Sequence, residues 1–239
     1  IKDVEFIMME KMQNTMMKRY QMFAWLGLII VLIAFWQALN GANANATFFS
    51  VDKATREAAG AGSAIVAANV VRHVTPTWVP SFKFLGLGIM LGAITMALGV
   101  IATTLRNLGT DVMSTWPSRL NPGTPPKPRS AKMFPMIMMM GWMVFLIGLI
   151  WALGLNGPVA SYWNHSIATE LNPAQAGSTL LNQLGVIKGS LPWLGALRFL
   201  GMGFLLTAIT VALTVVIRTL QHQEQNLRQF ISARTGAAD

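Results

Sequence analysis

Four long apolar runs dominate the pattern of hydrophobic and polar positions along this chain of 239 residues. None of the runs contains Asp, Glu, Lys, Arg or His. A helix rises about 1.5 Å per residue and the hydrocarbon core of a bilayer is about 30 Å thick, so each run is long enough to cross once. The pattern predicts an all-α integral membrane protein with four transmembrane helices, the first a retained span. The runs cover residues 22–39, 84–105, 133–155 and 199–217.

The second pattern is an internal repeat with a period of 115 residues. After that shift, 18 of the 45 positions in 61–105 are identical to their partners without a gap, including the loop tripeptide 61–63 and Trp78. The repeat predicts a tandem duplication of a two-helix hairpin. The predicted segments are an amphipathic cytoplasmic N-terminal helix at 1–21, the first two-span repeat at 22–106, a Pro-rich cytoplasmic linker at 107–132, the second two-span repeat at 133–220 and a polar cytoplasmic tail at 221–239.

The repeat also predicts how the helices pack. Each hairpin has an even number of spans, so both copies enter the membrane in the same direction and are related by a pseudo-twofold axis along its normal. Small side chains on the second helix of each copy let helix backbones approach closely. The expected packing residues are Gly88, Gly92, Ala93 and Ala97 in the first copy, and Gly203, Thr207, Ala208 and Ala212 in the second. We expect the hydroxyls of Thr95 and Thr210 to bond back to their own helices.

The distribution of basic residues predicts the orientation. Twelve Lys and Arg flank the spans on the side of the two termini, against six on the other side. By the positive-inside rule, both termini and the linker are cytoplasmic, in contact with anionic head groups, and we expect the bacterial inner membrane. Aromatic residues at the opposite ends of the spans are expected to be membrane-interface anchors. These are Trp36, Trp78, Trp151 and Trp193.

The loops on the outer side, at about 40–81 and 156–196, are too long to be simple turns. Helix-forming residues in both, including a start signal at Asn172 and Pro173, predict short outer amphipathic loop helices. The linker on the inner side holds five of the eleven Pro, so we expect it to be extended.

The composition leaves few residues that could carry out catalysis or bind a metal ion. Only 11% of residues are charged, against about 25% in soluble domains, and there are three His and no Cys. No span contains an ionisable residue of the kind that marks pumps and carriers, and no catalytic motif is present. We therefore expect neither an enzyme nor a bound cofactor. The net charge of +9 reflects the positive-inside bias rather than a nucleic-acid partner.

Methionine offers one alternative chemistry. The inner half of the third span carries Met136, Met139, Met140 and Met143, and thioethers are soft ligands for Cu(I). The four-residue spacing is similar to the MxxxM of copper importers over a few residues. The competing interpretation is that Met is a flexible apolar filler that adapts to neighbouring helices.

These patterns favour a non-catalytic structural or accessory subunit that stabilises and spaces the catalytic subunits of a larger membrane complex, such as an oxidoreductase, a monooxygenase or a respiratory assembly. Its partners would be other membrane subunits. The alternative is binding or transport of copper or a small hydrophobic ligand through the Met-rich and Trp-lined regions. A third possibility is a self-associated pore. Its lining would come from Thr95, Thr103, Thr207, Thr210 and Thr214.

Overall fold

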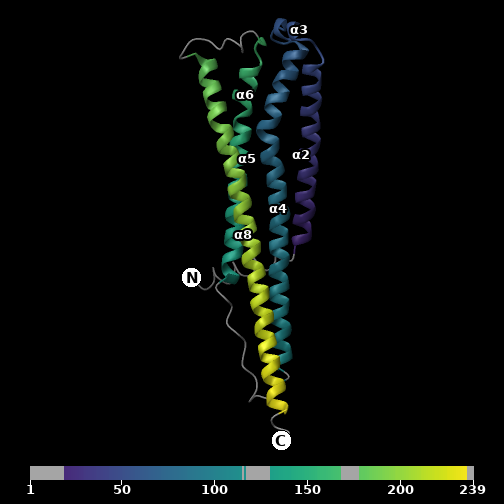
Figure 1. The fold of residues 1–239 in the computed structure, drawn as a ribbon, viewed down its shortest axis with the longest axis vertical. Coiled ribbons are helices and arrows are strands. Elements are labelled where there is room, and N and C mark those ends of the chain that lie inside the picture. Colours follow the sequence, from purple (N-terminus) through teal and green to yellow (C-terminus); the bar gives the residue numbers. More distant parts are fainter. Residues whose placement is uncertain (1–18, 115, 117–129, 168–177, 236–239) are drawn as a thin grey trace. The chain divides into compact units, whose positions relative to one another are not determined.

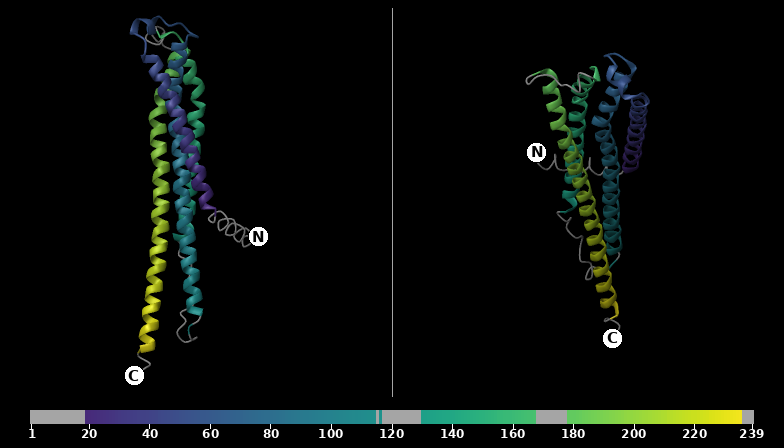
Figure 2. Two further views of the ribbon diagram at one scale, coloured as in Figure 1. Left: turned by 90° about the vertical axis from the view of Figure 1, so that its right-hand side faces the viewer. Right: turned by 45° about the horizontal axis from the view of Figure 1, so that its top comes forward.

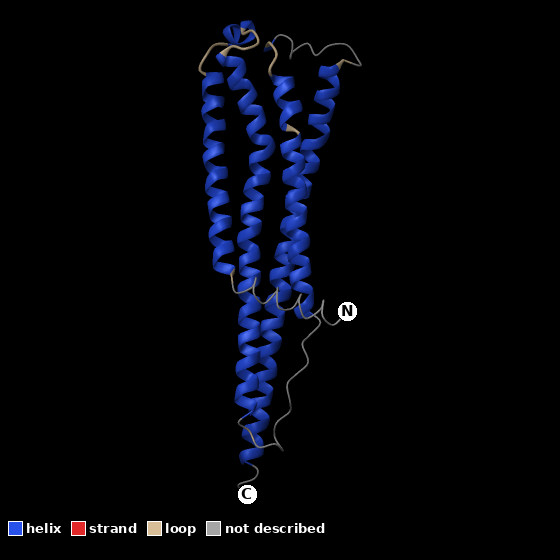
Figure 3. Cartoon of the chain, turned by 180° about the vertical axis from the view of Figure 1, so that it is seen from behind, coloured by secondary structure: helices blue, strands red, loops and turns tan. Residues whose placement is uncertain are grey.

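A computed structural model describes residues 19–114, 116, 130–167 and 178–235. Every regular element in these ranges is a helix, and none of the described residues forms a strand (Figures 1 and 3). The all-helical prediction is therefore confirmed for this part of the chain. The elements are α2 (Tyr20–Phe49), α3 (Lys53–Ala58), α4 (Ala64–Ser114), α5 (Ser130–Gly154), α6 (Asn156–Trp163) and α8 (Thr179–Thr235).

Four of the helical segments in the described ranges are long and apolar enough to cross a membrane, as the four runs predict. They are α2, α4, α5 continued by α6, and α8. Long apolar helices of this kind indicate an integral membrane protein, because their backbone groups are satisfied internally and their apolar side chains suit lipid.

Helices α4 and α8 are much longer than one crossing requires, with 51 and 57 residues. Both begin at the same place in the repeat, where Ser63 Oγ accepts from the backbone N–H of Val66 and Ser178 Oγ from that of Leu181, each at 3.3 Å. A serine that accepts a backbone N–H in the first turn stabilises a helix start. The first twenty residues of each helix, 64–83 and 179–198, therefore lie in continuous helix.

This continuity differs from the separate outer loop helices that we expected. Pro76, Pro80 and Pro192 all lie inside helices, where each removes one backbone hydrogen bond without ending the element. Among the described residues of the two expected loops, α3 is a separate short helix, whereas α6 continues the segment of α5. The start signal at Asn172 and Pro173 lies outside those residues.

The chain divides into two compact units. One unit contains residues 25–89 and 141–202, which include the first parts of α4 and α8. In this unit α5 and α6 run beside the first part of α8 (Figure 2), and a buried cluster of side chains joins them. Trp142 Nε1 also donates to the carbonyl oxygen of Gly88 at 2.9 Å, which links α5 to α4. The cluster consists of Ala152, Leu155, Val159, Tyr162, Ile187 and Leu194, with Val74 and Trp78 of α4 packed against it.

In the same unit, two glycines allow neighbouring helices to approach each other closely. A Cβ atom on Gly86 of α4 would lie 2.9 Å from the Gly27 carbonyl oxygen and from side-chain carbons of Ile30 and Val31 in α2. A Cβ on Gly201 of α8 would lie 2.8 Å from the ring of Phe145 in α5. These helices contact each other at positions that have no room for a side chain.

The other unit contains the described residues among 1–24, 90–140 and 203–239, and it holds the last parts of α4 and α8. Thr95 Oγ1 donates to the Leu91 carbonyl and Thr210 Oγ1 to the Leu206 carbonyl, both at 3.0 Å, so the expected back-bonds are confirmed. Residues 107–114, which we placed in the linker, continue α4. The tail continues α8 to Thr235. The predicted N-terminal helix at 1–18 and the linker prolines lie outside the described residues.

Candidate functional site

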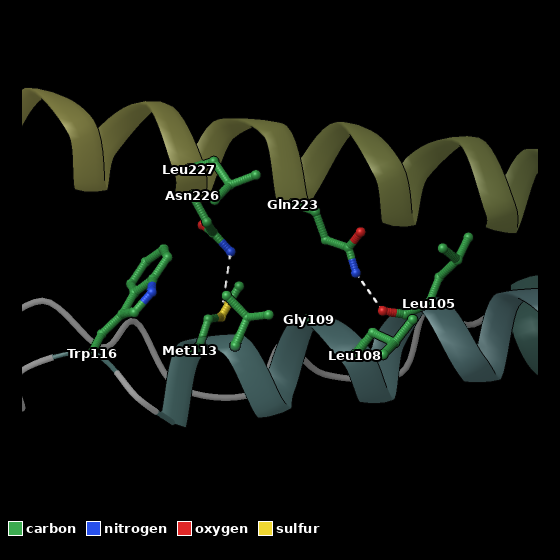
Figure 4. A pocket seen from close by; sticks show the side chains of 9 residues that line it. Leu105, Leu108, Gly109, Met113, Trp116, Gln223, Asn226 and Leu227 are labelled. Atoms are coloured by element: carbon green, nitrogen blue, oxygen red, sulfur yellow. Dashed lines mark hydrogen bonds between the residues drawn. The ribbon is translucent and has the colours of Figure 1, made fainter.

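The last turns of α4 and α8 lie side by side and run in parallel. The amide of Gln223 donates to the carbonyl oxygen of Leu105, and the Asn226 amide lies 3.7 Å from the sulfur of Met113 (Figure 4). Further along, the rings of Trp116 and Phe230 stack with centroids 4.4 Å apart. Contact partners advance together along both helices, which is the geometry of two parallel helices packed through one face each.

The amides fit because the facing helix leaves space for them. A Cβ on Gly109 would lie 2.6 Å from Gln223 Nε2, so glycine at this position lets the amide reach the backbone of α4. Asn226 is only 4% exposed and uses a thioether as its acceptor. Buried amides hold their partners because an unpaired polar group in the interior is costly. These contacts fix the register of the two helices.

Beside this contact lies an apolar groove with a volume of about 160 Å³. Leu108 and Leu227 on its walls are 55% and 48% exposed, and Val112 is also exposed. Figure 4 shows the amides of Gln223 and Asn226 directed from α8 toward α4 along it. The groove is lined by Leu105, Leu108, Gly109, Val112, Met113, Trp116, Gln223, Asn226 and Leu227.

Charged residues place this groove outside the hydrocarbon. Asp111 lies on the same turns of α4, and the ion pair between Glu224 and Arg228, at 2.7 Å, lies on the exposed face of α8. Ionised side chains at such density are not tolerated in the lipid interior. Leucine and isoleucine side chains exposed here, including Ile231, therefore face water unless another molecule covers them.

The lining of the groove is mostly apolar. Its lining contains no residue that titrates near neutral pH, and its polar groups are two amides and an indole. Within the described ranges, no three His, Cys, Asp or Glu side chains come together in a group that could hold a metal ion. Such a lining suits an apolar side chain or a helix face with a few hydrogen-bonding groups.

The expected packing residues differ in burial between the two copies. In the first copy Gly88, Gly92 and Ala93 are buried and Ala97 is half-buried. In the second copy Ala208 and Ala212 are buried, whereas Gly203 and Thr207 are exposed. Close packing of all eight residues stays a prediction.

The four tryptophans that we expected at the membrane interface divide into two kinds. Trp36, Trp151 and Trp193 are all exposed, as is typical of side chains that face lipid or a partner, whereas Trp78 is half-buried. Trp151 and Trp193 contact each other edge to face with ring centroids 5.4 Å apart, and Trp78 packs against the buried cluster. Their role as membrane anchors stays a prediction.

The four methionines of α5 that we named as candidate copper ligands are all exposed. Met136, Met139, Met140 and Met143 therefore lie where they can contact lipid, another protein or a metal ion carried by a partner. Met138 on the same helix is buried and acts as packing.

Several residues that organise the structure were not predicted as site residues. They are Gln223, Asn226 and Trp116, which line the groove, Phe230, which stacks on Trp116, and Arg198 in the first half of α8. The available signal was the spacing of Gln223, Asn226 and Phe230, which are three and four residues apart. Such spacing places the two amides and the aromatic ring on one helix face. Their partners on α4 are more than a hundred residues away in sequence, and no local pattern identifies them.

Comparison with protein-family models, with curated proteins and with solved structures finds no match for this chain. The function is therefore inferred only from the residues of this chain and their geometry.

Proposed function

We propose that this chain is a non-catalytic accessory subunit of a larger membrane complex, which it joins through the groove between the last turns of α4 and α8. The supporting observation is the exposure of Leu108, Val112 and Leu227 on turns that also carry charged residues. Burial of such side chains contributes about 25 cal/mol per Å² of apolar surface, so contact with another protein is favoured. The partner complexes remain the classes expected from sequence, an oxidoreductase, a monooxygenase or a respiratory assembly.

The occupant that suits this groove is an amphipathic helix of another membrane subunit. A helix presents apolar side chains every three or four residues, which matches the spacing of Leu108 and Val112 along the groove wall.

We infer also that the chain arose by duplication of a hairpin and that its halves pair around a pseudo-twofold axis. Phe84 and Phe199 are equivalent residues in the repeat, and their rings contact each other with centroids 6.1 Å apart. Contact between equivalent residues is what a twofold axis between parallel helices produces. The matching helix starts at Ser63 and Ser178 support the same inference.

The proposed orientation follows the basic residues, with both termini and the groove on the cytoplasmic side of a bacterial inner membrane. In that orientation the groove faces the compartment in which cytoplasmic domains of partner subunits are found.

Charged substitutions in the groove are expected to release the partner. Leu108→Lys with Leu227→Lys should lower the yield of co-purified subunits more than tenfold, because each ammonium group would have to be buried without a counter-ion. The measurement is native mass spectrometry of the complex extracted from its own membrane in mild detergent. A parallel metal analysis tests the copper alternative.

Gln225→Lys is the matched control, because Gln225 is exposed on α8 and does not line the groove. Its complex should survive intact. A lone chain or a homo-oligomer in the extract of the unmodified protein contradicts the subunit proposal, and copper retained by that chain would favour the alternative.

A further inference from the structure

The amide of Asn226 lines the groove with most of its hydrogen-bonding capacity unused. Asn226 is 4% exposed, and its Nδ2 atom donates to the sulfur of Met113 at 3.7 Å (Figure 4). A thioether is a weak acceptor. The Oδ1 atom, which can accept two hydrogen bonds, has no partner among the described residues. A nearly buried acceptor therefore lies at the groove without a donor from the described chain.

Pairing of α4 with α8 does not account for an amide at this position. Gln223, one turn earlier on α8, already donates to the backbone carbonyl oxygen of Leu105, which is a strong acceptor. Asn226 instead faces an apolar side chain, that of Met113. A leucine at position 226 would pack on this methionine without leaving an oxygen unpaired. The amide therefore suits a contact that the isolated chain does not make.

Covering the groove would remove water from the Asn226 oxygen. The exposed side chains of Leu108 and Leu227 on the walls favour an apolar occupant. An occupant that brought only apolar side chains would leave Oδ1 buried without a donor, which is unfavourable. A partner that seals the groove must therefore present a hydrogen-bond donor to Asn226.

The size and lining of the groove narrow the choice of donor. Its volume of about 160 Å³ is below the 300–1,000 Å³ usual for small-molecule pockets, so it suits individual side chains of a helix. No charged residue lines it, so a lysine or arginine of the partner would be buried without a counter-ion. Hydroxyls on helices tend to bond to their own backbone, as those of Thr207 and Thr210 do. The carboxamide of Asn or Gln meets these conditions.

We propose that Asn226 pairs with the carboxamide of an Asn or Gln on the partner helix, and that this pair selects the partner and fixes its register. The inference rests on the proposed function, since it needs a helix in the groove. Each carboxamide donates through its NH₂ group and accepts through its oxygen, so two of them satisfy each other. A single buried Asn specifies register and helix number in coiled coils, at a cost in stability.

Photo-cross-linking in the native membrane identifies the helix in the groove. Leu108→p-benzoylphenylalanine places a photoreactive group on the groove wall of the full chain, and peptide mass spectrometry locates the linked residue. We expect a helix of another subunit with an Asn or Gln within about one turn of that residue. A partner helix that lacks both overturns the inference and leaves the proposed function standing. A link to a second copy of this chain, or no link, overturns both.

Asn226→Leu distinguishes an amide pair from a purely apolar contact by the sign of its effect. With an amide pair, the carboxamide of the partner loses its hydrogen bonds, and the yield of co-purified subunit should fall at least about tenfold. With an apolar contact, the yield should stay or rise, because an unpaired oxygen is removed. Gln229→Leu is the matched control, since Gln229 is exposed on α8 and does not line the groove. It should change the yield less than about twofold.

Replacing the amide of the partner by leucine in the Asn226→Leu background completes the test. The two leucines should restore the yield to within about threefold of the parent complex, because no polar group is left unpaired. Loss with this rescue supports the amide pair. An unchanged or higher yield for Asn226→Leu alone overturns it. A loss without rescue also overturns it, because Asn226 would then act only on the pairing of α4 with α8.

Discussion

Gly86→Ala is expected to lower the free energy of unfolding by about 2 kcal/mol, since overpacking a well-packed contact costs about 1–3 kcal/mol. The added methyl group would lie 2.9 Å from the Gly27 carbonyl oxygen, and a backbone atom cannot rotate away. The side chains of Ile30 and Val31 crowd the same point. Helix α2 would have to move away from α4. Titration with a denaturing detergent, followed by helical circular dichroism, measures the loss.

Gly203→Ala is the matched control for this substitution. Gly203 lies on α8, and apart from its chain neighbours and the adjacent backbone of its own helix, no atom of the described structure lies within 4 Å of a Cβ placed there. Its replacement should change stability by less than about 0.5 kcal/mol, as is usual for sites without close neighbours. Equal losses for the two variants would show that α2 does not pack on α4 through Gly86.

Arg198→Met is expected to lower the free energy of unfolding by about 2 kcal/mol, since hydrogen bonds to charged groups contribute about 1.5–3 kcal/mol. In the intact chain Arg198 Nε donates to Ser81 Oγ at 2.9 Å and a terminal nitrogen donates to the Thr77 carbonyl at 3.1 Å. Arg198 is half-buried, and screening by solvent reduces the expected total for the two bonds to about 2 kcal/mol. The same denaturation experiment measures it.

The repeat supplies the control, because Lys83 occupies the position equivalent to Arg198 and is exposed. Lys83→Met should leave stability within about 0.5 kcal/mol of the parent. A double-mutant cycle with Ser81→Ala separates the bond from the bulk of the side chain. Additive losses in that cycle would mean that the bond to Ser81 contributes nothing and would refute its assigned role.

The membrane-crossing helices could be predicted because uncharged runs of about twenty residues have few alternatives to a helix in lipid. The ends of these helices could not be predicted. Pro76 and Pro192 signal a break in local sequence, yet both lie within long helices whose packing outweighs one lost hydrogen bond. Local sequence patterns therefore predicted the membrane-crossing segments. They assigned residues 64–83 and 179–198 to loops, although these residues belong to the same long helices.

The candidate site could be predicted only in part, for a related reason. The lack of ionisable residues in the spans led us to expect interaction rather than reaction, and that expectation comes from the sequence alone. The groove itself depends on contacts such as Gln223 with Leu105 and Trp116 with Phe230, which join distant parts of the chain.

The two amides on α8 have a consequence for stoichiometry. Two identical hairpins around a twofold axis would carry two identical grooves and recruit partners in pairs. In this chain Leu108 and Asp111 stand at the repeat positions of Gln223 and Asn226, so only one side of the helix pair carries the amides. If the groove docks a partner as proposed, this asymmetry predicts a single docking face and one partner helix for each copy of the chain.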